Sequence, residues 1–424
     1  MKQLVKIGLG VFLLIGLGSL TVFAAVESIS DEGIEGDIFG KKSGIIHPFL
    51  GVSGTYTDNM TNANENEESD YYTIISPGVM LALPGTGATD VSMSSATGAP
   101  GGLAQSRRSL STSRRFQGIA VYNPEFKKYS DNSDEDFTSQ RVAGEFQYNA
   151  PVGLSIDIAA KHQYAQEMWN ETPDSIDHAK YQDNVTSAIV DFALSPKFSL
   201  TAGGSYYTLA YKQDEFEYRD RDDRGFFGAV NFHIQPKTKL FCQYDRIDIR
   251  YDNDASEDQD NAEDTVSVGV DWRITSKSFG RCSVGFVDKD YDDSDKDDES
   301  TWNGEVSLSH MFTTRTMVTA TAVRGYYESN LASSDFYTTN RVSLGYTQAF
   351  THKLFANMML SYQNDDYDNV SVENDTWTFS PGVGFSPYRW LTCRLSWNHS
   401  DRDSDQEDWE YTTNEYTLSL TASF

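Results

Sequence analysis

The sequence predicts an all-β fold, a transmembrane antiparallel β-barrel of about eighteen strands with short periplasmic turns and long acidic extracellular loops. Three observations predict it. Strand-length segments alternate apolar and polar residues, short turns alternate with long acidic loops, and beyond residue 25 no apolar run approaches the roughly 20 residues of a membrane-spanning helix. A membrane protein without such helices must cross the bilayer as a closed barrel.

The N-terminus has the layout of a cleaved secretory signal. Lys2 and Lys6 flank the start of an apolar stretch, residues 7–20, which has no ionisable group, and small residues follow at Ala24 and Ala25. We expect a signal peptide over residues 1–25, a polar periplasmic lead over residues 26–46, and the barrel over residues 47–424.

The last strand is the clearest example of the alternation. Its apolar face consists of Tyr416, Leu418, Leu420, Ala422 and Phe424, with threonine and serine between them. This ending resembles the C-terminal strand of Gram-negative outer-membrane barrels. The resemblance implies an outer-membrane location and makes Phe424 the signal read by the barrel-assembly machinery. Because an open strand edge cannot face lipid, we expect this strand to close the barrel on the first strand, near residues 49–56.

Loop lengths alternate along the chain, which favours a barrel over a propeller. Each repeat consists of a strand, a long polar loop, a second strand and a tight turn. Tight turns are expected at residues 150–153, 195–197, 235–237, 275–277, 313–315, 351–353 and 386–389. Acidic loops are expected at residues 58–70, 131–136, 214–223, 252–264, 288–299 and 401–410.

Two prolines interrupt otherwise regular strands. Pro77 lies within the expected second strand, residues 71–83, and the same Ser-Pro-Gly-Val sequence recurs around Pro381. Since proline has no backbone N–H to donate, Pro77 predicts a bulge or a local gap in the hydrogen-bond ladder, and the matching sequence around Pro381 supports this interpretation.

Composition and charge exclude several classes of function. Hydrophobic residues make up 38% of the chain and aromatic residues 13%, as expected where half of each strand faces water and aromatics collect at membrane interfaces. The net charge of −29 argues against nucleic acid as a partner and against a polybasic lipid-binding role. Outer-membrane lipid and lipopolysaccharide are the expected surroundings.

The three cysteines, Cys242, Cys282 and Cys393, lie far apart and on the apolar faces of their strands. An odd number cannot all pair within one chain. We therefore expect small lipid-facing side chains rather than a disulfide or metal site.

The face opposite the apolar one is small, polar and intermittently charged, which is typical of a water-filled lumen. Charges on it either set the electric field that a passing solute meets or pair with each other across the wall. The alternation leaves both interpretations open. Candidate lumen-lining residues are Asp157, Lys161, Asp191, Asp271, Arg273, Arg281, Arg341 and Arg394.

Residues 85–115 form the longest segment without a strand pattern, rich in small residues and then basic at Arg107, Arg108, Arg114 and Arg115. Counting strands places it at the periplasmic end. It is expected to be a plug folded into the lumen, a contact for a periplasmic partner, or a disordered solvated loop.

Nothing in the sequence predicts a catalytic, cofactor or metal site. His399 and Ser400 are adjacent in a strand and therefore point to opposite faces. The acidic loop at residues 288–299 lacks the glycine of an EF-hand loop, so solvated, mutually repelling loops are favoured over a defined calcium site.

Residues 55–59, the Asn- and Glu-rich loop after them, residues 69–71 and residues 75–79 resemble the start of a family of beta-barrel porins found with exopolysaccharide biosynthesis operons. The resemblance covers roughly residues 49–83. It implies a barrel that takes part in export of an exopolysaccharide, with periplasmic polysaccharide-export components as partners. The acidic mouth favours a neutral or zwitterionic glycan.

The function expected from the sequence is therefore an outer-membrane conduit for an exopolysaccharide, not an enzyme. The alternative is a general or substrate-selective diffusion porin for small solutes. A third hypothesis is an outer-membrane barrel enzyme or adhesin, whose residues would have to converge from distant loops.

Overall fold

The computed structural model describes residues 44–83, 93, 95–103, 114–167, 179–252, 259–272, 277–331 and 333–423. Phe424 and the expected signal peptide lie outside the described residues. None of the helices in the described ranges is long and apolar enough to cross a membrane. The strands are β1 (Ile46–Thr57), β2 (Asp70–Leu83), β3 (Phe116–Tyr129), β4 (Phe137–Asn149), β5 (Leu154–Gln166), β6 (Lys180–Ala193), β7 (Phe198–Tyr211), β8 (Arg221–Gln235), β9 (Thr238–Tyr251), β10 (Asn261–Trp272), β11 (Ser278–Tyr291), β12 (Glu299–Thr313), β13 (Thr316–Glu328), β14 (Phe336–Ala349), β15 (Leu354–Tyr367), β16 (Val372–Tyr388), β17 (Leu391–Ser404) and β18 (Tyr411–Ser423).

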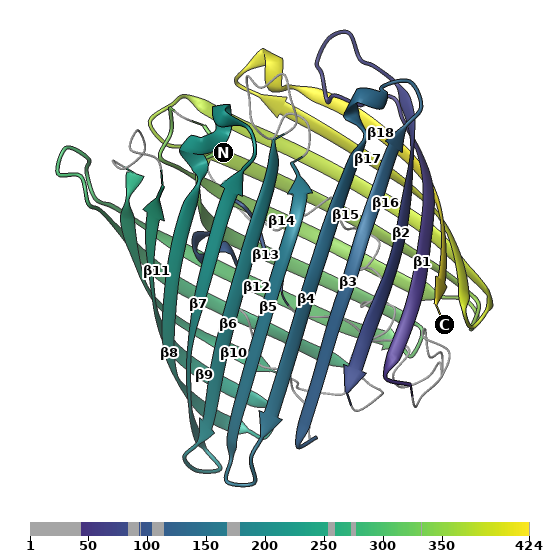
Figure 1. Ribbon diagram of the computed structural model, residues 1–424. Coiled ribbons are helices and arrows are strands. Elements are labelled where there is room, and N and C mark those ends of the chain that lie inside the picture. Colours follow the sequence, from purple (N-terminus) through teal and green to yellow (C-terminus); the bar gives the residue numbers. More distant parts are fainter. Residues whose placement is uncertain are drawn as a thin grey trace, which may run out of the picture.

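These strands form one closed 18-stranded sheet in which neighbours along the chain pair antiparallel. The tilted strands wrap into a barrel (Figure 1). The seam lies between β1 and β18, whose register runs from Phe49 opposite Ser423 to Tyr56 opposite Tyr416 and on to Thr57 opposite Glu415. The predicted strand number and the predicted closure of the last strand on the first are both confirmed.

Long and short connections lie at opposite rims of the barrel. The short 3-10 helices η2 (Ser133–Glu135), η3 (Asp214–Arg219) and η5 (Glu407–Trp409) belong to the long connections and stand at the upper rim in Figure 1. Two-residue to five-residue turns close the opposite rim, except after β2. The predicted separation of loop lengths is thus confirmed for the barrel as a whole, with two exceptions. The β15–β16 connection at the long-loop rim has only four residues, 368–371, and the β2–β3 connection at the turn rim is long.

The acidic loops are shorter than the sequence predicts, because the strands continue into them. Asp222 and Asp223 lie in β8, residues 261–264 in β10, residues 288–291 in β11 and residues 401–404 in β17. Cross-strand partners stabilise these acidic strand ends: Arg246 on β9, for example, lies 2.8 Å from the Asp264 carboxylate on β10. The expected loops therefore contribute carboxylates to the barrel wall itself.

The turn expected at residues 386–389 lies at residues 389–390 instead, because β16 continues to Tyr388. Its pairing with β17 shifts between Phe385 and Tyr388, and Pro387, which has no N–H to donate, falls in this irregularity.

The gap predicted at Pro77 is confirmed, and a similar gap occurs at Pro381. The β2–β3 ladder is interrupted between Ile75 and Val79, around Pro77. The β16–β17 ladder is interrupted between Phe379 and Gly382, around Pro381.

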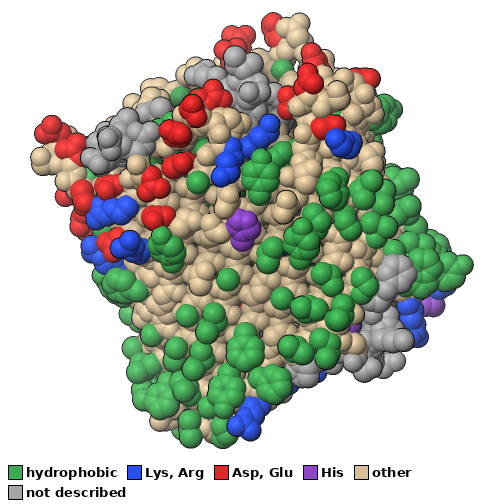
Figure 2. Space-filling model, viewed as in Figure 1, with side chains coloured by type: hydrophobic (Ala, Val, Ile, Leu, Met, Phe, Trp, Pro, Cys, Tyr) green, Lys and Arg blue, Asp and Glu red, His purple; other side chains and the backbone are tan. Residues whose placement is uncertain are grey.

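Side chains alternate between an exposed outer face and a more buried inner face. On β10, Val266 and Val268 are 54% and 51% exposed, while Ser267 between them points inward. Apolar side chains cover the middle and lower outer wall in Figure 2, and charged side chains gather toward the rim that carries the long loops. This distribution is that of a lipid-facing band beneath a water-exposed rim.

We expect a charge on the outer wall to destabilise the barrel far more than the same charge inside. Val268→Arg places a guanidinium in the apolar band and should lower the free energy of unfolding by about 2–4 kcal/mol. Ser267→Arg, on the neighbouring residue but facing the lumen, should cost much less. Urea unfolding in lipid vesicles, followed by tryptophan fluorescence, compares the two; equal losses would contradict the assignment of faces.

Candidate functional site in the barrel lumen

The connection between β2 and β3 places a small hairpin inside the barrel. Ser95 and Leu103 form an isolated antiparallel bridge, and the Ala96 N–H donates to the Gly102 carbonyl at 3.2 Å. The 3-10 turn η1 (Pro100–Gly102) closes the tip. Both Gly101 and Gly102 have a φ of 67°, a left-handed conformation that glycine adopts without strain. We call residues 95–103 the lumen hairpin.

Strand β2 ends at the turn rim, but the lumen hairpin that follows it binds residues near the opposite rim. Its partners include Glu328, the last residue of β13, and Asp223, near the start of β8. Both of these strand ends adjoin long loops. The described part of the β2–β3 connection, the lumen hairpin, therefore lies inside the barrel (Figure 1) close to the extracellular mouth.

The first anchor is a hydroxyl. Ser95 Oγ donates to the Asp183 carboxylate on β6 at 2.5 Å, and it accepts from Lys161 Nζ on β5 at 2.7 Å. Both partners are almost fully buried. One serine thus links a buried cation to a buried anion, which lowers the cost of desolvating each.

The second anchor is centred on Glu167, immediately after β5. Thr97 Oγ1 donates to its carboxylate at 3.0 Å, Tyr211 OH at 2.6 Å, and Arg219 at 2.9 Å from both terminal nitrogens. The Arg219 guanidinium also lies 4.5 Å from the centroid of the Tyr211 ring. A bidentate arginine–carboxylate pair of this kind fixes direction as well as distance.

The third anchor binds the hairpin through its backbone. Arg221 donates to the Ala99 carbonyl at 3.0 Å, and the Gly101 N–H donates to the Asp223 carboxylate at 2.9 Å. Arg221 and Asp223 are also an ion pair at 3.3 Å on the inner face of β8. Strand β8 therefore supplies both a donor for a backbone carbonyl of the hairpin and an acceptor for a backbone N–H.

The fourth anchor joins the hairpin to a buried ionic cluster. The Glu328 N–H donates to the Gly98 carbonyl at 2.8 Å. The Glu328 side chain pairs with Lys289 on β11 and accepts from Tyr251 OH at 2.6 Å, and Lys289 lies 3.4 Å from Glu263. These charges are nearly inaccessible to water, so each depends on its neighbours for compensation.

Packing seals the hairpin against β7. A Cβ atom on Gly102 would lie 2.0 Å from the Tyr207 ring, so the two are in direct contact. Met93, Tyr207 and Phe216 belong to one buried apolar cluster. The expectation of an entirely wet lumen is therefore wrong on this side, where inward-facing Val185, Tyr207 and Leu209 form a packed core beneath the hairpin.

A carboxylate at the mouth titrates near neutral pH. Asp220, between η3 and β8, accepts from the Tyr211 N–H at 2.7 Å. Burial raises the pKa of Asp220 to about 6, and the neighbouring carboxylates of Asp252 and Glu217 act in the same direction. Acidification through pH 6 therefore removes negative charge from the rim and relieves repulsion around η3.

The candidate lumen residues that the structure describes fall on the inner face, and several of them pair. Lys161 belongs to the first anchor, and Asp157 is fully buried two inward positions before it on β5. Asp191 accepts from Thr201 Oγ1 at 2.5 Å. Arg281 pairs with Asp271 at 3.3 Å and with Glu305 at 3.4 Å.

Three other candidates remain. Arg341 is buried on the inner face of β14, and Arg394 is half-buried on the inner face of β17. Arg273 lies outside the described residues.

The basic stretch at residues 107–115 supplies none of the described contacts that hold the lumen hairpin. Arg107 and Arg108 lie outside the described residues. Arg114 and Arg115 immediately precede β3, where their carbonyls accept from the Asn149 side chain at 2.7 Å and the Asn149 N–H at 2.8 Å. Placement inside the lumen is shown for residues 95–103 instead.

Sequence reasoning missed most of the anchoring charges. Asp223 and Glu263 fell within stretches that read as acidic loops, and Arg219 lies in η3. Glu167 and Glu328 stand at strand ends, where alternation no longer assigns a face. The available signal was the presence of basic residues among the acids, as in the sequence around Arg219 and Arg221.

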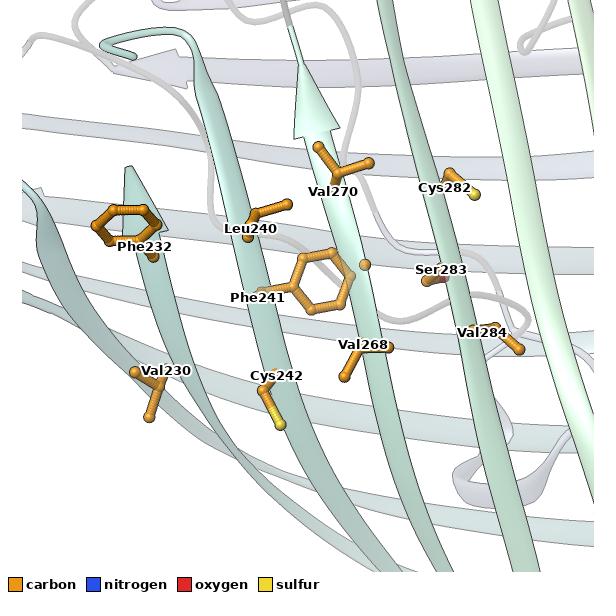
Figure 3. Close-up of a pocket in the computed structure, with 11 residues that line it drawn as sticks. Val230, Phe232, Leu240, Phe241, Cys242, Val268, Val270, Cys282, Ser283 and Val284 are labelled. Atoms are coloured by element: carbon orange, nitrogen blue, oxygen red, sulfur yellow. The ribbon is translucent and has the colours of Figure 1, made fainter. Parts of the chain in front are cut away.

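The outer wall carries a shallow apolar hollow of about 540 Å³ between β8 and β11 (Figure 3). Two of the three cysteines, Cys242 and Cys282, lie in it and are unpaired, and Cys393 is also free. The prediction of small lipid-facing cysteines is confirmed. The lining residues are Val230, Phe232, Leu240, Phe241, Cys242, Val268, Gly269, Val270, Cys282, Ser283 and Val284.

Among the described residues, no group of three or more histidine, cysteine or acidic side chains is placed to hold a metal ion. The acidic strand ends are instead engaged with arginines and tyrosines, as where Arg250 lies 3.3 Å from Asp260.

Comparisons with known proteins found solved structures of similar shape and one family model. No protein with a curated description matches the sequence. OccK2 (OpdF) of Pseudomonas aeruginosa has 9% identity, with 89% of this chain and 98% of that chain covered and a TM-score of 0.47. A BenF-like porin of Pseudomonas fluorescens Pf-5 has 11% identity, with 91% and 100% covered and a TM-score of 0.46.

The family model described as "Putative beta-barrel porin 2" matches residues 114–424. This match lies outside residues 49–83, on which the sequence resemblance rested, and covers most of the barrel. With the closed 18-stranded sheet and its apolar outer band, it establishes the class of protein: the chain belongs to the Putative beta-barrel porin 2 family and is an outer-membrane β-barrel porin.

Proposed function

We propose that the protein is a selective channel through which small hydrophilic solutes diffuse across the outer membrane. The observation that carries this proposal is the docked lumen hairpin. Its nine residues, 95–103, lie inside a closed barrel and are bound by β5, β6, β8 and β13. A solute must pass beside the hairpin, so its size and charge decide its rate of passage.

A polysaccharide fits this lumen less well than a small solute. A polymer needs a continuous path past the hairpin, and displacing the hairpin would expose buried partners such as Asp223 and Glu328. Each buried polar group left unsatisfied costs about 1–3 kcal/mol. The comparisons support a porin and offer nothing in favour of polysaccharide export.

The charge of the mouth favours cations and zwitterions over simple anions. The chain has a net charge of −29, and its acidic residues concentrate on the long-loop rim (Figure 2). A field of one sign at a channel entrance raises the local concentration of the opposite ion.

The test is solute uptake by liposomes that contain the purified protein, with neutral sugars of increasing size and a dextran as the polymer. We expect uptake to fall steeply with size and to vanish for dextran, and reversal potentials in a KCl gradient to show preference for K⁺. Uptake of dextran at a rate like that of a monosaccharide would contradict the proposal. Loss of surface polysaccharide on gene deletion would instead favour a conduit for exopolysaccharide export.

A further inference from the structure

We propose that Arg394, together with Asn357, forms a subsite in the lumen for the carboxylate of a small organic acid or zwitterion. This inference rests on the proposed function and adds the chemical class of a preferred solute. Arg394 lies on the inner face of β17, opposite Gly384 on β16 and Ser419 on β18. It stands near the turn rim, on the side of the barrel away from the anchors of the lumen hairpin.

Among the described residues Arg394 has no carboxylate partner, in contrast to three other basic residues of the lumen. Arg281 pairs with Asp271 and Glu305, Arg219 with Glu167, and Lys289 with Glu263 and Glu328. In the described part of the chain, Arg394 Nε is buried and has no acceptor. A guanidinium withdrawn from water without a counterion gains strongly from an anion that reaches it.

Arg394 is half-buried on the inner face of β17, so an anion in the lumen can reach its guanidinium. A Cβ atom on Gly382 would lie 3.1 Å from Arg394 Nε and Nη2 and 3.0 Å from Asn357 Oδ1, so the guanidinium lies against the bare backbone of β16 beside the amide. Its cross-strand neighbours Gly384 and Ser419 are small, and the Phe355 ring lies over Gly384.

The chemistry of the subsite indicates a carboxylate with a neighbouring donor group. The planar guanidinium binds a carboxylate through two parallel hydrogen bonds. Asn357 Oδ1 is also buried without a partner, so it can accept from a hydroxyl or ammonium group of the same solute. A single positive charge with neutral neighbours matches a monoanion better than a phosphate dianion.

The subsite and the acidic mouth are compatible because they act in sequence. The mouth discriminates against net negative charge at a distance, whereas Arg394 acts only on a group within hydrogen-bond reach. A zwitterion satisfies both, since its net charge is zero and its carboxylate is available for the guanidinium.

The experiment compares uptake of glycine, lactate, inorganic phosphate and the neutral sugar arabinose by liposomes with wild-type protein, Arg394→Gln or Arg281→Gln. Arg281→Gln removes a lumen charge that is already paired. We expect Arg394→Gln alone to lower the glycine-to-arabinose and lactate-to-arabinose uptake ratios about tenfold, the effect of losing roughly 1.4 kcal/mol of binding. Arg394→Lys keeps the positive charge but not the two parallel hydrogen bonds of a guanidinium, so its uptake ratios should lie between those of the wild-type protein and Arg394→Gln.

Two outcomes would overturn the inference. Equal losses in Arg394→Gln and Arg281→Gln would show a general effect of lumen charge, and a larger loss for phosphate than for lactate would assign the wrong ligand class. Arabinose uptake separates this inference from the proposed function. If arabinose fails to enter with the wild-type protein, the channel proposal fails; if it enters normally and the carboxylate ratios do not change, only the Arg394 subsite fails.

Discussion

Shortening the lumen hairpin is expected to raise the single-channel conductance severalfold. The variant replaces residues 96–102 with two glycines. This keeps the Ser95–Leu103 bridge and closes it with a two-residue turn, a length that antiparallel pairs accept. The change removes the Thr97, Gly98, Ala99 and Gly101 contacts and so empties the part of the lumen where the hairpin lies. Planar-bilayer recording in KCl measures the effect.

A point variant tests the same idea without a deletion. In Gly102→Val the new Cβ would lie 2.0 Å from the Tyr207 ring, and the φ of 67° is one that valine tolerates poorly. The hairpin must therefore move away from Tyr207. Gly345→Val is the matched control, because a Cβ on Gly345 has no neighbour closer than 3.7 Å. Higher conductance is expected for the first variant only. Unchanged conductance in the shortened variant would mean that the hairpin does not limit the path.

The barrel wall could be predicted from the sequence because each part of it obeys a local rule. Residues two apart share a face, so Val266 and Val268 could be assigned outward and Ser267 inward from three adjacent positions. Closure followed from the cost of an open edge in lipid, and the register of β1 on β18 agrees with it.

The predicted loop boundaries are wrong where acidic residues continue a strand. Aspartate is rare in strands, so residues 261–264 read as loop. In the structure they continue β10 because the ladder to β9 and β11 extends beyond the lipid and because their side chains find partners, as Asp264 does with Arg246. A preference measured on average strands does not apply where an acidic side chain has a cross-strand cation.

The lumen hairpin could not be predicted, since nothing periodic marks it. Its contacts join residues separated by 66 to 230 positions, such as Ser95 with Lys161 and Gly98 with Glu328. The choice left open between a plug and a solvated loop depends on these distant partners. Composition alone favoured disorder, because small residues bury little apolar area; buried ionic partners supply the stabilisation instead.

The buried cluster around Lys289 should have the largest effect on stability of the charges in the wall. Lys289 and Glu328 are each 1% exposed at their side chains, and Glu263 is 5% exposed. Lys289→Met leaves two carboxylates facing each other without a cation. Breaking a buried pair in this way lowers the free energy of unfolding by about 3–5 kcal/mol.

Two further variants make that result specific to the charges. Lys289→Met combined with Glu328→Gln removes the repulsion and should recover part of the loss, since the remaining Glu263 no longer faces a second buried anion. Lys128→Met breaks a pair with Asp136 in which the lysine side chain is 65% exposed, so it should cost less than about 1 kcal/mol. Urea unfolding in lipid vesicles gives all three values. If Lys289→Met lowers the free energy of unfolding no more than Lys128→Met does, water must reach the cluster. The hairpin would then be bound too loosely to close that part of the lumen.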